Sequence, residues 1–175
     1  GISRNPCRRA RQFLEAAHQF RNLPAMVHAE KGLGRFLRRL PGRKILLTNS
    51  SGDYARQVLS ILGIAPFFER IIPIETMCIA GRYTPKPSRR FFQHLPVLLK
   101  AASSRCILIE DDIQSLKTAK IAGMKTVLVT RYLNRSHQST HAYARPRRKT
   151  SAGRPSYVDA RVGSVLRLAR CLAGK

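Results

Sequence analysis

The sequence is poor in acidic residues and has no tryptophan. Its 175 residues include 33 Lys and Arg against 9 Asp and Glu, so the formal net charge at pH 7 is +24. A charge of this size fits the binding of nucleic acid, an anionic membrane surface or only an arginine-rich surface without a function, and composition alone does not favour nucleic acid. Because 43% of the residues are hydrophobic, we expect a globular fold rather than a disordered chain.

Other absences exclude whole classes of protein. No apolar stretch approaches the length of about 18 residues that a transmembrane helix needs, so no membrane partner is expected. The first residues contain charges but no apolar segment of the kind that marks a secretory signal peptide. The four cysteines are widely spaced and form no CxxC pair, so neither a zinc knuckle nor a disulfide framework fits. A cytoplasmic location is therefore predicted.

The composition changes along the chain and predicts four segments. Residues 1–43 form a basic helical segment, and residues 44–130 form an α/β core. Residues 131–156 contain Arg and Lys but no acidic residue and predict a basic flexible loop, which is followed by a helical tail at 157–175. The tail includes a short helix predicted over 162–172.

Within the core, short apolar strands alternate with helices. Strands that are apolar throughout indicate a parallel sheet with both faces covered, so the predicted fold class is a Rossmann-like α/β fold with helices on both faces. Pro73 favours an edge or the end of the second strand. The expected strands are 45–47, 70–75, 106–109 and 126–129, and the expected helices are 54–62, 88–100 and 113–122.

Three consecutive acids, Glu110, Asp111 and Asp112, follow the third strand. At the carboxyl end of a parallel strand such residues face the usual ligand crevice. Clustered carboxylates repel one another unless a cation joins them, which favours a Mg²⁺ site. Alternatively, the same acids stabilise the N-terminus of the following helix.

Thr48, Asn49 and Ser50 end the first strand in the same way, and Lys86 lies between two prolines. A hydroxyl group beside free N–H groups can bind phosphate, although Ser50 or Ser51 could simply cap the next helix. A lone lysine in a loop is usually solvated. Together with the acidic run, however, these groups are the parts that phosphoryl transfer requires.

Three stretches of sequence resemble motifs of the haloacid dehalogenase-like (HAD) superfamily. They are LLTNS at 46–50, KPS at 86–88 and LIEDDIQSLKTAKIAGMKTVLV at 108–129, which are similar to the second, third and fourth motifs. The third stretch is the most specific, and the resemblance runs from Gln12 to Val129. The most similar branch is that of the pyrimidine 5′-nucleotidase-like hydrolases.

The resemblance implies a Mg²⁺-dependent hydrolysis of small phosphomonoesters or nucleotide 5′-phosphates through an aspartyl-phosphate. It implies that Thr48 and Lys86 are catalytic and bind the phosphate together with Asn49. It also implies that Asp111 and Asp112 hold the metal, although Asp112 stands where this branch usually has Ser. Residues 12–40 would be the end of a helical cap module.

The first motif of this superfamily, DxDxT, is absent, because the first aspartate of the sequence is Asp53. The motif supplies the nucleophile and a general acid/base, so the resemblance predicts that this chain alone is inactive. Together with a first residue that is not Met, this suggests a truncated protein. The missing strand would lie between strands 44–48 and 106–109, so each of these would lack a neighbour on one edge.

Two other nucleotide- or phosphate-related folds are excluded. A response-regulator receiver needs a further Asp one strand after the acidic run, but the only acid beyond Asp112 is Asp159. No GxGxxG follows a strand, so a dinucleotide-binding domain does not fit. The remaining alternative is a non-catalytic basic protein that binds nucleic acid or another polyanion. Tyr132 and Tyr143 are the few aromatics in its basic loop, which disfavours base stacking. The sequence does not determine the oligomeric state.

Overall fold

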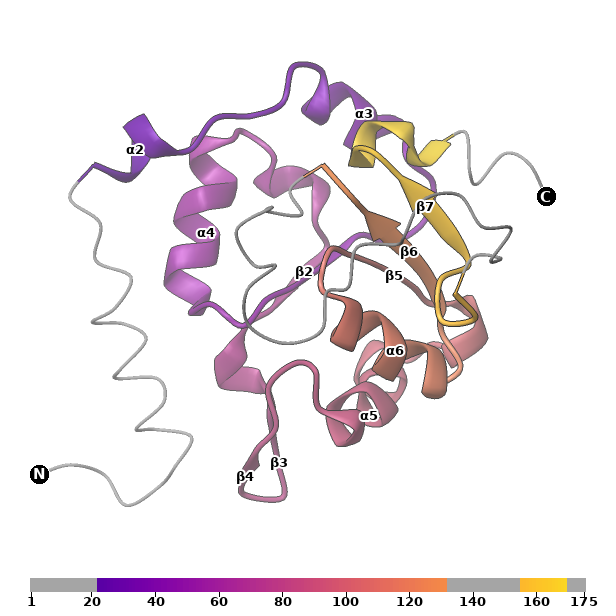
Figure 1. The fold of residues 1–175 in the computed structure, drawn as a ribbon. Helices are drawn as coiled ribbons and strands as arrows, with labels where there is room; N and C mark the ends of the chain where they lie inside the picture. Colours follow the sequence, from indigo (N-terminus) through magenta and orange to yellow (C-terminus); the bar gives the residue numbers. More distant parts are fainter. Residues whose placement is uncertain (1–21, 132–154, 170–175) are drawn as a thin grey trace, which may run out of the picture. The chain divides into compact units, whose positions relative to one another are not determined.

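A computed structural model of the chain describes residues 22–131 and 155–169, and Figure 1 labels most of their helices and strands. Residues 1–21 of the expected basic helical segment, residues 132–154 of the expected basic loop and residues 170–175 of the expected tail lie outside these ranges. The chain divides between Phe91 and Phe92 into two compact units. The stretch predicted as one α/β core therefore contributes to both units, which are described separately below.

The first unit contains a parallel pair of strands, β1 (Ile45–Leu47) and β2 (Arg70–Ile72). As the proline predicts, β2 ends immediately before Pro73. An antiparallel hairpin that the sequence did not predict follows, with strands β3 (Cys78–Ile79) and β4 (Arg82–Tyr83). The helices of this unit are α2 (Leu23–Met26), α3 (Leu33–Arg39) and α4 (Gly52–Ile61), with 3₁₀ turns at Ala65–Phe67 and Ile74–Thr76.

The core of the first unit lies where α3 and α4 pack together. Leu37 of α3 and Leu59 of α4 are buried with Ile64, and Leu46 of β1 packs against them. Apolar residues three and four positions apart produce this contact, as the helical pattern predicts. Gly63 ends α4 with a φ of +64°, a left-handed conformation that glycine adopts without a Cβ clash.

The second unit contains a three-stranded parallel sheet in the order β5-β6-β7. The sequence predicted β5, α6 and β6, but it assigned Val162 to a helix. Instead, Val162 pairs with Val129 in the sheet, because pairing with a distant strand outweighs the local pattern. The elements are α5 (Arg89–Leu99, which begins before the unit boundary), a 3₁₀ turn at Ser103–Arg105, β5 (Ile107–Glu110), α6 (Ile113–Ile121), β6 (Lys125–Val129), β7 (Ala160–Val162) and a 3₁₀ turn at Val165–Arg167.

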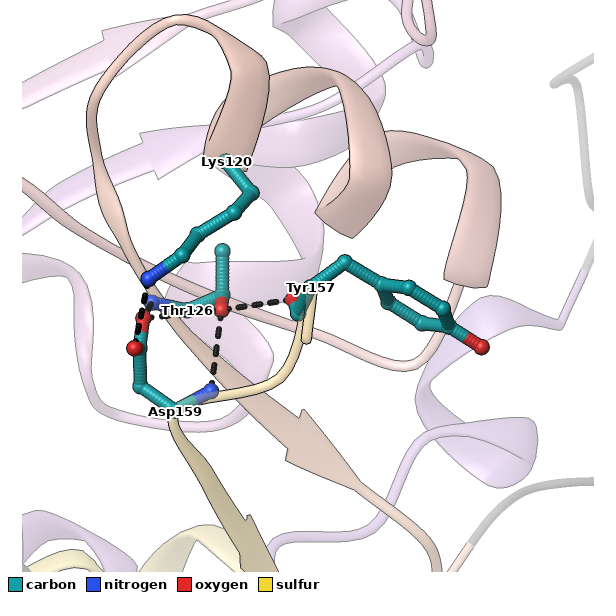
Figure 2. A network of polar contacts seen from close by, with 4 residues as sticks. All are labelled: Lys120, Thr126, Tyr157 and Asp159. Carbon is teal, nitrogen blue, oxygen red and sulfur yellow. Dashed lines mark hydrogen bonds and ion pairs between the residues drawn. The ribbon is translucent and has the colours of Figure 1, made fainter. Parts of the chain in front are cut away.

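A polar network joins α6, β6 and the residues that precede β7 (Figure 2). The Asp159 carboxylate pairs with Lys120 Nζ and accepts a hydrogen bond of 2.8 Å from the Thr126 N–H. The Thr126 hydroxyl, fully buried, donates to the Tyr157 carbonyl at 2.8 Å. Partial burial raises the pKa of Asp159, but the hydrogen bonds from Lys120 and Thr126 outweigh it and hold the pKa below its ordinary value.

The strands differ in burial, although all were predicted to be covered on both faces. Residues 126–129 of β6 are buried throughout, whereas Ile107 and Ile109 of β5 are 40% and 37% exposed. The three residues of β1 are half-buried. Within the described residues, β6 has two strand neighbours while β1 and β5 have one each. A second neighbouring strand is therefore associated with the more complete burial.

The cysteines differ from the sequence-based expectation. Cys78 is disulfide-bonded, whereas Cys106 forms no disulfide and its thiol donates to the Ala102 carbonyl. The spacing of the cysteines did not predict the disulfide at Cys78. Across residues 22–131 and 155–169, no helix is both long enough and apolar enough to cross a membrane.

Candidate functional site

The first candidate site begins where β1 ends. The Thr48 N–H donates to the Ile72 carbonyl at 3.1 Å, which extends the β1–β2 pairing by one residue. The Thr48 hydroxyl oxygen accepts a hydrogen bond of 3.0 Å from the Ser50 N–H. The hydroxyl proton of Thr48 has no acceptor among the described residues, so it can donate to an anion. The turn therefore exposes one donor group at the strand end.

The N-terminus of α4 already has its own hydrogen-bond partners. Of the two serines that could cap this helix, Ser51 does so, since its hydroxyl accepts from the Tyr54 N–H at 3.3 Å. The Glu75 carboxylate accepts from the Gly52 N–H at 3.0 and 3.2 Å. These two bonds satisfy part of the first turn, so an anion would have to bind before the helix rather than on these N–H groups.

Lys86 is held in a loop that follows the β3–β4 hairpin. At its base, the buried Thr84 donates from both its N–H and its hydroxyl group to the Met77 carbonyl, at 2.8 and 2.9 Å. On the other side, the Ser88 N–H donates to the Pro85 carbonyl at 2.8 Å and closes a turn around Lys86. The Lys86–Pro87 peptide bond is cis. Both flanks of Lys86 are therefore fixed by main-chain hydrogen bonds.

Asn49 joins this loop to the end of β1. Its side-chain amide nitrogen donates to the Lys86 carbonyl at 2.9 Å, and its side-chain oxygen accepts from the Lys86 N–H at 3.0 Å. Thr48 immediately precedes Asn49 in the sequence, so the three residues predicted to bind phosphate are brought together in the first unit. The Asn49 N–H has no acceptor among the described residues and adds a second donor.

The second candidate site is the acidic run after β5. Asp112 is the N-cap of α6, and its carboxylate accepts from the Gln114 and Ser115 N–H groups at 3.2 and 2.8 Å. Asp111 is exposed, and its N–H donates to the Glu110 carboxylate at 3.2 Å. No partner for the Asp111 carboxylate is found in the described part of the chain. The capping alternative therefore applies to Asp112, while Asp111 remains open to a ligand.

A metal would have to bind here with few protein ligands. Among residues 22–131 and 155–169, no group of three or more His, Cys, Asp or Glu side chains could hold a metal ion. Mg²⁺ does not require one, because it commonly takes one or two carboxylates and completes its octahedron with water and phosphate oxygens. An exposed carboxylate such as that of Asp111 fits this form of binding.

Two acids have structural roles that the sequence analysis did not identify. Glu75 caps α4, and Asp159 binds Lys120 and Thr126. The scarcity of acidic residues could have indicated these roles, since each acid in so basic a chain is expected to bind a basic or N–H partner. The Tyr83 hydroxyl is buried without a partner among the described residues, and burial, together with the Glu75 charge, raises the pKa of Tyr83.

Solved structures with the same fold include enzymes of two kinds. A conserved haloacid dehalogenase-like protein of unknown function from Agrobacterium tumefaciens is 19% identical, with a TM-score of 0.61 over 87% of this chain and 63% of that one. The L-2-haloacid dehalogenase of Xanthobacter autotrophicus is 18% identical (TM-score 0.61; 82% and 60% covered). A HAD phosphatase from Thermococcus onnurineus is 18% identical (TM-score 0.55; 81% and 55% covered). Identities this low show the fold alone.

The chain spans less than two thirds of the length of these three structures. No curated protein matches it. The family model of the haloacid dehalogenase-like hydrolases matches residues 8–129, well over half of the sequence. The α/β fold with parallel strands and this match lead to one conclusion: the chain belongs to the haloacid dehalogenase-like hydrolase family.

Proposed function

We propose that this chain carries the phosphate-binding part of a Mg²⁺-dependent phosphohydrolase, within the pyrimidine 5′-nucleotidase-like branch of its family. The observation that carries the proposal is the direct link between Asn49 and Lys86. It joins a strand end that has a free hydroxyl proton to a loop that carries an ammonium group. The proposed substrates are small phosphomonoesters, including nucleotide 5′-phosphates.

In this proposal Thr48, Asn49 and Lys86 each make a different contact with the phosphate. The Thr48 hydroxyl and the Asn49 N–H donate to phosphate oxygens, and the Lys86 ammonium neutralises their charge. Hydrogen bonds from neutral donors position a phosphate, while a cation lowers the cost of the charge that develops during transfer. The large excess of basic residues favours the approach of such an anion.

The acidic run favours a phosphatase over a dehalogenase. The α6 N–H groups stabilise the Asp112 carboxylate, whereas the adjacent Asp111 carboxylate has no partner among the described residues, and a cation would relieve the repulsion between the two. We propose that Asp111 holds Mg²⁺, with Asp112 assisting from its capping position. When bound, the ion would neutralise phosphate oxygens as a Lewis acid.

The test is to titrate the 175-residue chain with inorganic phosphate, with and without Mg²⁺, by calorimetry. We expect saturable binding that Lys86→Met weakens, and an increase in affinity with Mg²⁺ that Asp111→Asn removes. A chain that binds no phosphate under either condition would contradict the proposal.

A turnover assay with p-nitrophenyl phosphate and with L-2-chloropropionate separates the two chemistries. We expect no turnover of either compound by this chain, because the family's nucleophile is an aspartate that precedes the Thr48 motif and no aspartate precedes Asp53. Robust Mg²⁺-dependent phosphatase activity that Asp111→Asn abolishes would contradict the expected inactivity. Release of chloride would contradict the proposed substrate class.

A further inference from the structure

We propose that the Asn49 side chain is a positioning residue that holds the main chain of Lys86 and so fixes the origin of its ammonium group. The role rests on the proposed phosphate site and deepens it. Asn49 makes two hydrogen bonds to one residue that is 37 positions away in the sequence. They engage both the N–H and the carbonyl of Lys86.

The pairing matches the chemistry of a carboxamide. One end of the side chain accepts and the other donates, so it can bind a peptide N–H and a peptide C=O at the same time. A carboxylate at this position could accept from the Lys86 N–H but would repel its carbonyl. A serine hydroxyl offers a single oxygen, and glutamine adds a methylene group that changes the reach. The geometry at 2.9 and 3.0 Å therefore selects Asn among polar side chains.

Fixing the main chain of Lys86 restricts where its ammonium group can lie. A lysine side chain has four flexible carbons, and any freedom of its Cα adds to the freedom of its ammonium group. Other hydrogen bonds hold the flanks of the loop at Thr84 and Ser88. The bonds from Asn49 act on Lys86 itself and tie it to the residue after Thr48. An ammonium group that starts from a fixed point loses less freedom when it binds an anion.

A direct role for the Asn49 carboxamide on the phosphate is the competing explanation. Its oxygen and one of its two N–H protons already point to the Lys86 main chain, which leaves one proton. The two explanations differ in one measurable respect. A positioning residue acts through Lys86, so its effect on affinity disappears once the lysine ammonium is removed, whereas a direct ligand keeps its effect.

The experiment is a double-mutant cycle on the full chain, with inorganic phosphate as the probe. We expect Asn49→Ala to weaken phosphate binding about fivefold, the value of one ordinary hydrogen bond. In the Lys86→Met background, Asn49→Ala should change the affinity by less than about twofold, because the pair is coupled. Asn49→Asp, which keeps only the accepting oxygen, should bind as weakly as Asn49→Ala.

Asn22→Ala is the matched control. Asn22 is also exposed and stands at a helix N-cap, but its side chain makes no capping hydrogen bond. We expect its phosphate affinity to equal that of the wild type. A thermal melt of each variant distinguishes a loss of affinity from a loss of folded protein.

A second readout does not depend on phosphate. Hydrogen exchange of the Lys86 amide, followed by NMR, should accelerate about fivefold in Asn49→Ala, because its acceptor is removed. Exchange at the Thr84 amide, which donates to Met77, should not change. Unchanged exchange at Lys86 would overturn the link between the two residues.

The possible failures are distinguishable. If the wild-type chain does not bind phosphate, the proposed function fails, and the exchange measurement alone decides whether Asn49 holds Lys86. If phosphate binds and Asn49→Ala weakens it equally with and without the Lys86 ammonium, Asn49 is a direct ligand and the positioning role is wrong.

Discussion

Two strand–helix junctions, one in each unit, satisfy the unpaired N–H groups at the start of a helix with different side chains. After β1, Ser51 caps α4 and Glu75 supplies a second acceptor. After β5, Asp112 alone accepts from two N–H groups of α6. In both junctions the capping group is the residue immediately before the helix. The residues that precede it include Thr48 and Asn49 in one unit and Asp111 in the other. The Thr48 hydroxyl proton, the Asn49 N–H and the Asp111 carboxylate have no partner among the described residues.

The two junctions show that adjacent residues of the same chemical type can have different roles, one in capping the helix and the other in binding. Asp111 and Asp112 are adjacent carboxylates, yet one is exposed without a partner among the described residues and the other has two. We therefore expect substitutions at capping positions to change stability, and substitutions at the preceding positions to change binding.

The largest expected effect is on the ligand side of the first junction. We predict that Lys86→Met weakens the binding of inorganic phosphate about 30-fold, because a charge-assisted hydrogen bond is lost. Calorimetric titration measures the change. Lys44→Met is the matched control, since the Lys44 ammonium donates to the Gly42 carbonyl. Equal losses in the two variants would mean that general positive charge, rather than this site, attracts the anion.

The next effect separates the two aspartates of the second junction. We predict that Asp112→Ala lowers the free energy of unfolding by about 1.5 kcal/mol, because both capping hydrogen bonds are lost. Asp111→Ala should change it by less than about 0.5 kcal/mol, as for an exposed residue without partners. Urea denaturation measures both values without Mg²⁺. If Asp111→Ala were the more destabilising variant, the assignment of the cap to Asp112 would be wrong.

A smaller effect is expected for the equivalent position in the first junction. Ser51→Ala should cost about 1 kcal/mol, since a serine cap contributes one bond and Glu75 continues to bind the Gly52 N–H. The same denaturation experiment on Ser50→Ala is the control, because Ser50 takes part through its N–H rather than its side chain. If both serine variants behaved alike, the cap would not be the cause.

The smallest effect is a pH dependence in the second unit. The lowered pKa of Asp159 means that its charged form stabilises the fold above the ordinary aspartate range, and that this stabilisation is lost as the pH falls through the folded-state pKa. We predict that Asp159→Asn costs about 1 kcal/mol at pH 7, since the Asp159 side chain is one third exposed, and less as the pH falls below the ordinary aspartate range and through the folded-state pKa.

Thermal melts across this pH range test the prediction. Glu69→Gln is a control from the first unit, because the hydrogen bond from Arg43 also lowers the pKa of Glu69 but the pair is half exposed. A smaller pH-dependent loss is expected there. A difference between wild type and Asp159→Asn that grows as the pH falls would have the wrong sign and contradict the assignment.

Local patterns predicted most of the elements that surround the two junctions. The apolar runs at 45–47, 106–109 and 126–129 correspond to β1, β5 and β6 with shifts of at most one residue. The β3–β4 hairpin was not predicted, because its turn places Ala80 as well as Gly81 at positive φ. Alanine gives no signal for that conformation, and only the glycine is typical of such a turn.

The candidate sites were predictable only in part. Their place after a strand indicated Thr48 and Asp111, while Lys86 was singled out by its place between two prolines. Nothing local indicates that the Asn49 side chain binds a main chain 37 residues away, or that Asp112 rather than Asp111 completes the cap. The capping residue depends on where the helix begins, and a shift of one residue exchanges the two roles.

By itself, the sequence determined the alternation of strands and helices and the chemistry that the strand ends can offer. These follow from hydrophobic periodicity and from side-chain functional groups, which are properties of neighbouring residues. Tertiary structure decided which groups remain available for a ligand. Asn49, Glu75 and Asp159 all find their partners far along the chain, and hydrogen bonds of that kind exist only after the fold has brought distant backbone and side-chain atoms within about 3 Å.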